Sequence, residues 1–491
     1  MSARLQAMRV RWPLLLALAV VVVGRSLLFR YPVYPDEAGF YQVAKDLMEN
    51  GGPGLYGHYF VDRPPTLIWI FMIGAAAGDV LVMRVLVGAL LLCFVALAWF
   101  TVRRLGGNAV WAVAVAAAFV ITPEFGAQAA NGEAFAIPFV MAGFACFVQA
   151  ERHKGRVAWL WCGGAGFLGL LAMTIKQNFA DVFVFAVAVL LGLGLRRLRT
   201  WSDVASRLGA GVAGAAVAVS IMVGYALTTD AGVHGLWVAA VDFRTDADDV
   251  LNAGYRTGIE GRIDALTQHA WIAGLIPFGL VLLGMAIFWR FRVSALSYAI
   301  GAVIAFETVC VLMGGNFWSH YLMGFAPGVV LAAGMWARHL PIAIASTYVV
   351  LSSLVALPVN LHLLSERGPD TAQEVGGFVK DSAAPGDTAT VMYGSADLQW
   401  STGMRSPYEH LWSLPVRVLD PDLDDLTALL RSEDAPTWLV VTFDVHTWGL
   451  DPGGQIDQVL AERYREVLAE CGNTVLLLRS VERDLAPAPD C

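Results

Sequence analysis

Residues 34–41 read YPDEAGFY, and they follow closely on an apolar run at 12–29. A helix is predicted to begin at Asp36 and Glu37 and to end near Asn50, where a Gly-Gly-Pro sequence follows. Its apolar side chains recur on one face, so the helix is expected to lie on the membrane surface. Two adjacent carboxylates at the point where the chain leaves the lipid predict a polar site at the rim of a membrane protein.

The composition is that of a membrane protein. Of the 491 residues, 57% are hydrophobic and 15% are charged, and the mean hydropathy is +0.60. Soluble domains carry about 25% charged residues, so much of this chain must lie in lipid. The formal net charge of −8 gives no indication of a nucleic-acid partner. Cys471 and Cys491 lie in the polar tail, and the sequence leaves open whether they pair.

Eleven apolar runs are candidates for membrane spans. They lie at 12–29, 85–102, 105–123, 135–150, 157–174, 179–195, 208–227, 270–289, 293–313, 321–337 and 340–357. A further apolar piece at 64–78 reaches only about 22 Å at about 1.5 Å per residue, against a hydrocarbon core of about 30 Å. The sequence therefore predicts an interfacial or re-entrant helix at 64–78.

The basic residues set the expected orientation. If 64–78 does not span, every short basic cluster falls on the same side of the membrane. The clusters lie at 4–11, 103–104, 152–156, 196–207, 290–292 and 338. The positive-inside rule then predicts a cytoplasmic N-terminus and an exported C-terminus.

The fold class predicted is a polytopic α-helical membrane protein with about eleven transmembrane helices and a small exported C-terminal α/β domain. The membrane module is expected at 1–357, with outer loops at 30–84 and 228–269, and the exported domain at 358–491. In this tail, β-type runs alternate with helical patterns, as in small α/β domains. The β-type runs lie at 388–393, 438–442 and 474–478, and the helical patterns at 371–381, 423–431 and 456–463.

The acidic pair has two interpretations. In the structural one, Asp36 caps the helix and Glu37 complements its dipole. In the chemical one, the carboxylates act on a reactant, since a cap accounts for one acid better than for two. Arg63, set before Pro64 and Pro65, either anchors the chain at the headgroups or holds a fixed cation for an anionic ligand.

Other polar residues are expected on the same side of the membrane. Lys176 lies at the outer end of a span, and His320 and Tyr321 lie in an aromatic-rich turn. Each of them also has an ordinary structural interpretation, as an interfacial lysine or a packed histidine. Arg262 belongs to the acid-rich outer loop and is a further candidate.

Acids inside apolar runs are also candidates, because they are costly in lipid. Glu133 follows Asn131 and Gly132 at the start of one span, and Glu307 lies within another. Such residues mark functional sites by default. Glu307 is the weaker candidate, because a buried hydrogen-bonding partner would satisfy it.

These motifs, in this order and topology, resemble the GT-C superfamily of integral membrane glycosyltransferases. The likeness is greatest to the branch that contains protein O-mannosyltransferases and lipid A aminoarabinose transferases, and it covers nearly the whole chain. Arg63 replaces the lysine of the family's Lys-Pro-Pro-Leu element, and Glu133 stands where relatives have an aspartate or a glutamate. The matching elements are Asp36-Glu37 with Phe40-Tyr41, Arg63-Pro64-Pro65, Asn131-Gly132-Glu133, Lys176-Gln177, and His320-Tyr321 through Pro327.

The resemblance implies a multi-pass enzyme of the bacterial cell envelope, in the plasma membrane. Such an enzyme moves a sugar from a polyprenyl-phosphate donor to a hydroxyl of a protein, lipid or glycan, with inversion. Asp36 is expected to be the base, and Glu37 to orient the acceptor, support Asp36 or ligate a divalent cation. The donor phosphate is expected at Arg63, Lys176, His320 and Tyr321, with Asn131, Glu133 and Arg262 as other polar candidates. The resemblance leaves the cofactor open, with Mg²⁺ or Mn²⁺ at Asp36 and Glu37 as the one candidate.

Two other classes of function stay open from the sequence. A transporter or flippase would use Asp36, Glu133 and Glu307 as an ion or proton relay. Against it, the charges crowd one face instead of the bilayer midplane, and no inverted repeat is found. A non-catalytic assembly or sensor protein would use its exported domain to bind a partner.

Overall fold

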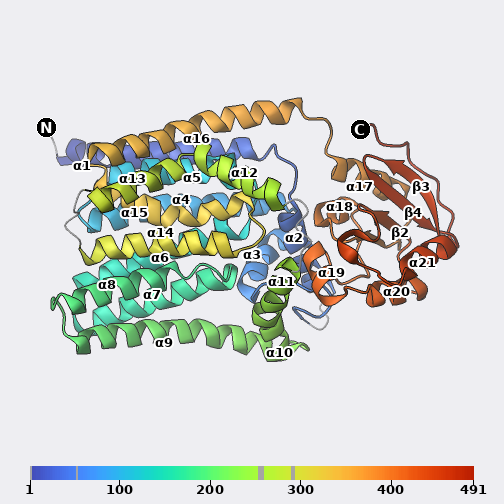
Figure 1. The fold of residues 1–491 in the computed structure, drawn as a ribbon, viewed down its shortest axis with the longest axis horizontal. Coiled ribbons are helices and arrows are strands. Elements are labelled where there is room, and N and C mark those ends of the chain that lie inside the picture. Colours follow the sequence, from blue (N-terminus) through green and yellow to red (C-terminus); the bar gives the residue numbers. More distant parts are fainter. Residues whose placement is uncertain (1–2, 51–53, 253–258, 289–293) are drawn as a thin grey trace.

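The computed structural model describes residues 3–50, 54–252, 259–288 and 294–491. It is a bundle of long helices with a small α/β domain at one end (Figure 1). Each of the eleven predicted runs corresponds to a helix of this bundle. These are α1 (Ala3–Leu28), α4 (Leu81–Arg104), α5 (Ala109–Ile121), α6 (Gly132–Arg152), α7 (Gly155–Ile175), α8 (Asp181–Leu195), α9 (Trp201–Ala226), α13 (Leu275–Phe288), α14 (Ala295–Met313), α15 (Ala326–Trp336) and α16 (Leu340–Glu366).

A multi-pass membrane protein is therefore confirmed, but the number of spans is not. Within the described residues, seven helices are long and apolar enough to cross a bilayer. A helix pair bent by 69°, α12 (Ile259–Ile272) with α13, would make an eighth. Helices α5, α8 and α15 are shorter than the span of about 20 residues that a bilayer requires. The count of eleven stays a prediction.

The short apolar piece forms α3 (Pro65–Ala77), a helix of 13 residues that is capped by Pro64 at its N-terminus and by Gly78 at its C-terminus. Gly78 has φ 75°, a left-handed conformation that stops the helix. With α2 (Pro35–Glu49), α10 (Gly232–Trp237) and α11 (Phe243–Asn252), it lies between the bundle and the α/β domain (Figure 1). We call this end of the bundle the domain-facing end.

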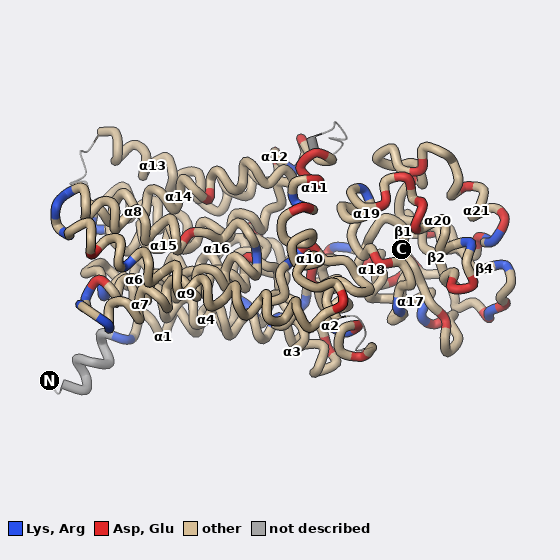
Figure 2. The backbone as a smooth tube through the Cα atoms, turned by 90° about the horizontal axis from the view of Figure 1, so that it is seen from below, with Lys and Arg blue, Asp and Glu red and all other residues tan. Residues whose placement is uncertain are grey.

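The opposite end is basic. The N-terminus lies there, and Figure 2 shows Lys and Arg segments gathered at the same end of the bundle. Arg103 and Arg104 close α4, Arg152 closes α6, and Arg196 follows α8. These basic residues are thus separated from the α/β domain by the length of the bundle, and the predicted cluster at 290–292 lies outside the described residues.

Small residues let two helices of the bundle approach closely. A Cβ added at Gly166 of α7 would overlap the backbone of Gly211 in α9, and one at Gly214 would overlap the backbone of Gly163. Close backbone approach through small residues is typical of helix packing in membranes. The contact between α7 and α9 therefore depends on glycine.

The α/β domain is built on a mixed sheet with the order β1-β2-β4-β3. Strand β1 (Ala389–Met392) is parallel to β2 (Trp438–Val441), and the other two pairings are antiparallel. Its helices are α17 (Thr371–Ser382), α18 (Ala396–Ser401), α19 (Ser413–Leu419), α20 (Asp424–Arg431) and α21 (Gln455–Arg463), and its last strands are β3 (Tyr464–Glu470) and β4 (Asn473–Leu478).

Side-chain alternation along β2 gives the domain a core on each face of the sheet. Leu439 packs with Leu426 and Ile456 on one face, and Trp438 packs with Val375 and neighbouring residues of α17 on the other. The three predicted strands and three predicted helices of the tail are present.

The sequence interpretation missed several features of this domain. Strand β3 and helices α18 and α19 were not predicted, and α16 continues past the domain boundary expected after residue 357. Cys471, at the turn between β3 and β4, and Cys491 form a disulfide, which settles the pairing that the sequence left open.

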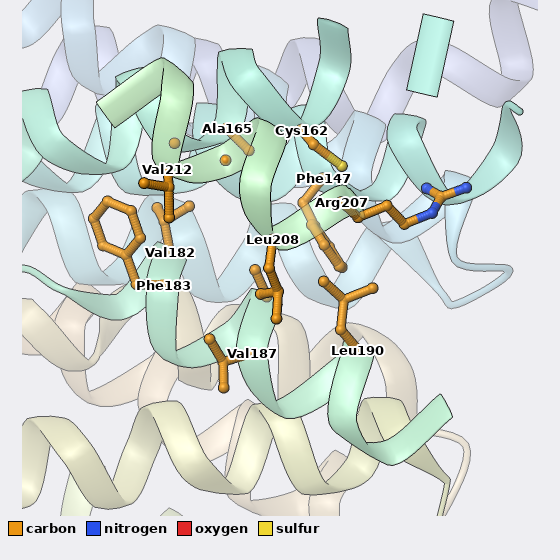
Figure 3. Close-up of a pocket in the computed structure, with 13 residues that line it drawn as sticks. Phe147, Cys162, Ala165, Val182, Phe183, Val187, Leu190, Arg207, Leu208 and Val212 are labelled. Atoms are coloured by element: carbon orange, nitrogen blue, oxygen red, sulfur yellow. The ribbon is translucent and has the colours of Figure 1, made fainter. Parts of the chain in front are cut away.

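An apolar cavity of about 100 Å³ lies among α6, α7, α8 and α9. Figure 3 shows its lining, which includes Phe147, Val182 and Leu208. Arg207 is the one charged residue of the lining, and its guanidinium pairs with Glu151 and Asp203. The lining contains no carboxylate or hydroxyl, so we place the candidate site elsewhere.

Substitution of Gly214 by valine should separate α7 from α9. Overpacking of a close contact costs about 1–3 kcal/mol, so we expect a lower thermal unfolding temperature in detergent. The matched control is Gly209→Val on the same helix, because a Cβ at Gly209 would meet nothing within 4 Å. Equal unfolding temperatures for the two variants would contradict this packing.

Candidate functional site

Glu37 fixes the start of α2 inside the protein. It is fully buried, and its two oxygens accept hydrogen bonds of 2.8 and 2.7 Å from Nε and Nη2 of Arg84 in α4. The backbone N–H groups of Ala130 and Tyr34 donate to the same carboxylate. Arg84 is buried as well, and its other N–H groups reach carbonyls of the segment before α2. This network attaches α2 to α4.

The contacts of Glu37 do not fit the role of metal ligand that the sequence suggested. Each of its oxygens already accepts two hydrogen bonds. Among the residues that the structure describes, no group of three or more His, Cys, Asp or Glu could hold a metal ion. A divalent cation at this place would find Asp36 as its one available carboxylate.

Asp36 lies on the side of the predicted cations. Its half-buried carboxylate interacts electrostatically with Arg63, Lys176, His320 and Tyr321. These residues come from the loop before α3, from the end of α7 and from the 3-10 turn before α15. The structure therefore gathers the predicted base and the predicted phosphate-binding residues at the domain-facing end of the bundle.

Lys176 is held by Glu133 and Tyr321. Its ammonium group donates to Glu133 at the start of α6 and lies 4.3 Å from the centroid of the Tyr321 ring. His320 approaches the same Glu133 oxygen at 3.7 Å. Glu133 is 2% exposed, so its charge is balanced by Lys176 instead of by water.

The protonation of this cluster follows from burial. Burial lowers the pKa of His320 below its ordinary value, although the Glu133 carboxylate acts in the opposite direction. Burial likewise lowers the pKa of Lys176, and Glu133 again opposes the change. His320 is therefore neutral near pH 7, and a bound anion would favour its protonated form.

A second cluster surrounds Asp62, which the sequence interpretation did not select. Arg63 Nη1 lies 2.7 Å from Asp62 Oδ2, and Arg244 of α11 pairs with the same oxygen. The Arg63 guanidinium also lies over the Phe40 ring, 5.9 Å from its centroid. Burial alone would raise the pKa of Asp62, but Arg244 and Arg63 hold it below its ordinary value.

Arg244 was also missed, although a signal for it exists in the sequence. It is an arginine inside an acid-rich outer segment that contains Asp242, Asp246 and Asp248. With Arg244 included, three cations at the site (Arg63, Arg244 and Lys176) face three carboxylates (Asp36, Asp62 and Glu133). The cluster is thus close to electrically neutral before any ligand binds.

Two other sequence candidates have structural contacts instead. Asn131 caps α6 by accepting a hydrogen bond from the Ala134 N–H, and it donates to the Gly126 carbonyl. The Arg262 guanidinium of α12 lies over the Trp318 ring, 5.0 Å from its centroid. Among the described contacts, none joins Arg262 to the group around Asp36.

Glu307 lies in the bundle and contacts Asp181 at the start of α8. Both are buried, at 1% and 0% exposure. Among the described residues, none makes a hydrogen bond to an oxygen of either carboxyl group. Asp181 therefore does not satisfy Glu307, and the structural interpretation of Glu307 stays a prediction.

Comparisons with solved structures support the membrane fold. A crystal structure of ArnT from Cupriavidus metallidurans, bound to undecaprenyl phosphate, matches with a TM-score of 0.59 and 14% identity over 94% of this chain and 97% of that one. The oligosaccharyltransferase AglB from Archaeoglobus fulgidus, in complex with an inhibitory peptide and a dolichol-phosphate, matches with a TM-score of 0.52 and 10% identity over 98% of this chain and 74% of that one.

Both neighbours are GT-C superfamily membrane glycosyltransferases. The resemblance drawn from the sequence motifs is therefore confirmed at the level of the fold. No family model and no curated protein matches the sequence.

Removal of Glu37 should destabilise the protein strongly. Glu37→Ala leaves the buried Arg84 without its partner, and breaking such a pair costs about 3–5 kcal/mol. The control is Glu49→Ala, which removes an exposed ion pair with Lys45 at 3.9 Å on the same helix and should have little effect. Thermal unfolding in detergent measures both, and a stable Glu37→Ala protein would contradict the role assigned to this pair.

Proposed function

We propose that this chain, which has the fold of the GT-C membrane glycosyltransferases, moves a sugar from a polyprenyl-phosphate donor to a hydroxyl acceptor. The observation that carries the proposal is the placement of Asp36 among Arg63, Lys176 and His320 at the domain-facing end. A carboxylate beside fixed cations suits the activation of a hydroxyl next to a departing phosphate.

The proposed location is the bacterial plasma membrane, with the N-terminus in the cytoplasm. The positive-inside rule supports this orientation, because basic segments gather at the end opposite the α/β domain (Figure 2). Asp36 then faces the outside of the cell. Nucleotide sugars are cytoplasmic, so a transferase with this orientation needs a donor carried across the membrane on a lipid.

The neighbouring structures support a lipid phosphate as the donor group. ArnT was solved with undecaprenyl phosphate, and AglB with a dolichol-phosphate. In this chain we assign the phosphate to Arg63 and Lys176, with Arg244 and His320 beside them. Arg63 is the first candidate, because a guanidinium can bind a phosphate through two parallel hydrogen bonds.

The proposed reaction is a single displacement with inversion. Asp36 takes the proton of the acceptor hydroxyl as the acceptor oxygen forms its bond to the anomeric carbon. The bond from that carbon to the phosphate oxygen breaks, and polyprenyl phosphate leaves with the electron pair. The cations stabilise the charge that grows on the phosphate; removing one such group typically costs about 3–4 kcal/mol. Glu37 holds α2 in place and takes no direct part.

The contacts give less support to the transporter alternative. Of its three relay acids, Glu133 is paired with Lys176 and Glu307 contacts Asp181. Labelled donor offered to the purified protein separates the possibilities. Release of polyprenyl phosphate supports the transferase, whereas vesicle uptake without bond cleavage supports a transporter.

Asp36→Asn should slow transfer strongly and leave donor binding intact, because the amide cannot accept the acceptor proton. Base catalysis by a positioned group contributes about 10²–10⁴-fold, so release of polyprenyl phosphate should slow by that factor. Glu49→Gln, at an exposed acid of the same helix, is the control. Near-normal turnover by Asp36→Asn would remove the base assignment.

A proton on His320 should increase the affinity of the protein for polyprenyl phosphate. In the free protein, burial lowers the pKa of His320, and a bound phosphate would raise it. Binding therefore takes up a proton, and affinity gains from lower pH between about pH 8 and about pH 6.

The measurement is calorimetric titration of wild type and His320→Gln with undecaprenyl phosphate across this pH range. Protonation of the phosphate itself affects both proteins equally, so the difference between the two pH profiles gives the contribution of His320 to the affinity. We expect wild type to gain up to about 10-fold relative to the variant as the pH falls. Parallel pH profiles would show that His320 does not face the phosphate.

A further inference from the structure

The α/β domain is attached directly to the helix that bears Asp36. Gln42 of α2 donates to the Ala396 carbonyl of α18 at 2.8 Å, and Asp46 pairs with Arg405 at 2.6 Å. Further along the first outer loop, His58 lies 2.9 Å from the Ser406 carbonyl oxygen. These contacts hold the domain against α2, so the domain is attached to the bundle by more than its covalent connection to α16.

One side chain of the domain reaches Asp36 itself. Trp412, the residue before α19, donates from its indole Nε1 to Asp36 Oδ1 at 3.1 Å. Its ring covers Gly39, where an added Cβ would overlap the indole. It also packs against Phe40 with 5.3 Å between ring centroids. The indole is thus fixed in position by α2 while its N–H points at the carboxylate.

The packing of Trp412 on Phe40 also connects it to Arg63, the proposed phosphate-binding cation. Phe40 packs against Trp412, and the Arg63 guanidinium lies over the Phe40 ring, 5.9 Å from its centroid. The indole of Trp412, the ring of Phe40 and the guanidinium of Arg63 therefore form a chain of contacts beside Asp36. A displacement of Trp412 would disturb the predicted base and the predicted cation together.

We propose that Trp412 is a positioning residue for Asp36, so that the α/β domain completes the transferase site. The inference rests on the proposed function and adds to it a role for the domain. The indole N–H occupies Oδ1 and fixes the orientation of the carboxylate, which leaves Oδ2 for the acceptor hydroxyl.

The test is Trp412→Phe, which keeps an aromatic ring on Gly39 and Phe40 and removes the N–H donor. We expect kcat to fall by about 10-fold or more, with KM for the donor unchanged. Trp412→His, which retains a ring N–H, should recover part of the rate.

Two controls separate positioning from a general loss of structure. Trp400→Phe changes a half-buried tryptophan of the same domain and should leave the rate unchanged. Adding Trp412→Phe to Asp36→Asn should cost nothing more, because Trp412 acts through Asp36. Additive losses, or a slow Trp412→Phe enzyme whose rate Trp412→His does not recover in part, would overturn the inference.

The two proposals fail in different ways. A wild-type kcat in Trp412→Phe, with Asp36→Asn inactive, would overturn the role of Trp412 and leave the transferase intact. A wild-type protein that releases no polyprenyl phosphate from any donor sugar tried would overturn the proposed function, and the inference with it.

Discussion

The buried pair of Glu37 and Arg84 is the constraint on which the candidate site depends. Helix α2 is short and lies across the end of the bundle, so helix propensity alone would not fix its position. A desolvated guanidinium and carboxylate are costly unless all of their hydrogen bonds are made, and here backbone groups complete the set. The pair can form in very few orientations of α2 relative to α4. In the orientation observed, Asp36, one residue away, lies on the side of Arg63, Lys176 and His320.

The rest of the site is assembled from loops far apart in the chain. The loop before α3 brings Asp62 and Arg63, α11 brings Arg244, and the ends of α7 and α6 bring Lys176 and Glu133. These segments meet because successive helices of the bundle turn back at the same end (Figure 1). The α/β domain then covers this end from outside, with contacts concentrated on α2. Membrane helices, interfacial helices and domain thus form one structural unit around Asp36.

Much of this could be read from the sequence, because apolar periodicity and charge placement are local signals. They predicted the bundle helices, the short α3 and the placement of Asp36, Arg63, Lys176 and His320 at one end of the bundle. Other features depend on tertiary contacts and have no local signal. Asp36 and Glu37 are adjacent acids, and only the position of Arg84 makes one structural and leaves the other available. Trp412 lies 376 residues from its partner Asp36. Strand β3 was missed because its buried side chains, Tyr464 and Leu468, are four residues apart instead of alternating, with a register shift between Glu466 and Leu468.

The carboxylates that accompany the cations have a consequence for selectivity among lipids. Asp62 and Glu133 are built-in counter-ions for Arg63, Arg244 and Lys176. Under the proposed function, an arriving phosphate would have to displace them in an ion exchange. An uncompensated basic cluster would also retain anionic phospholipid headgroups, whereas a cluster that is already neutralised would hold them weakly. It would favour a lipid whose additional sugar and chain contacts offset the exchange.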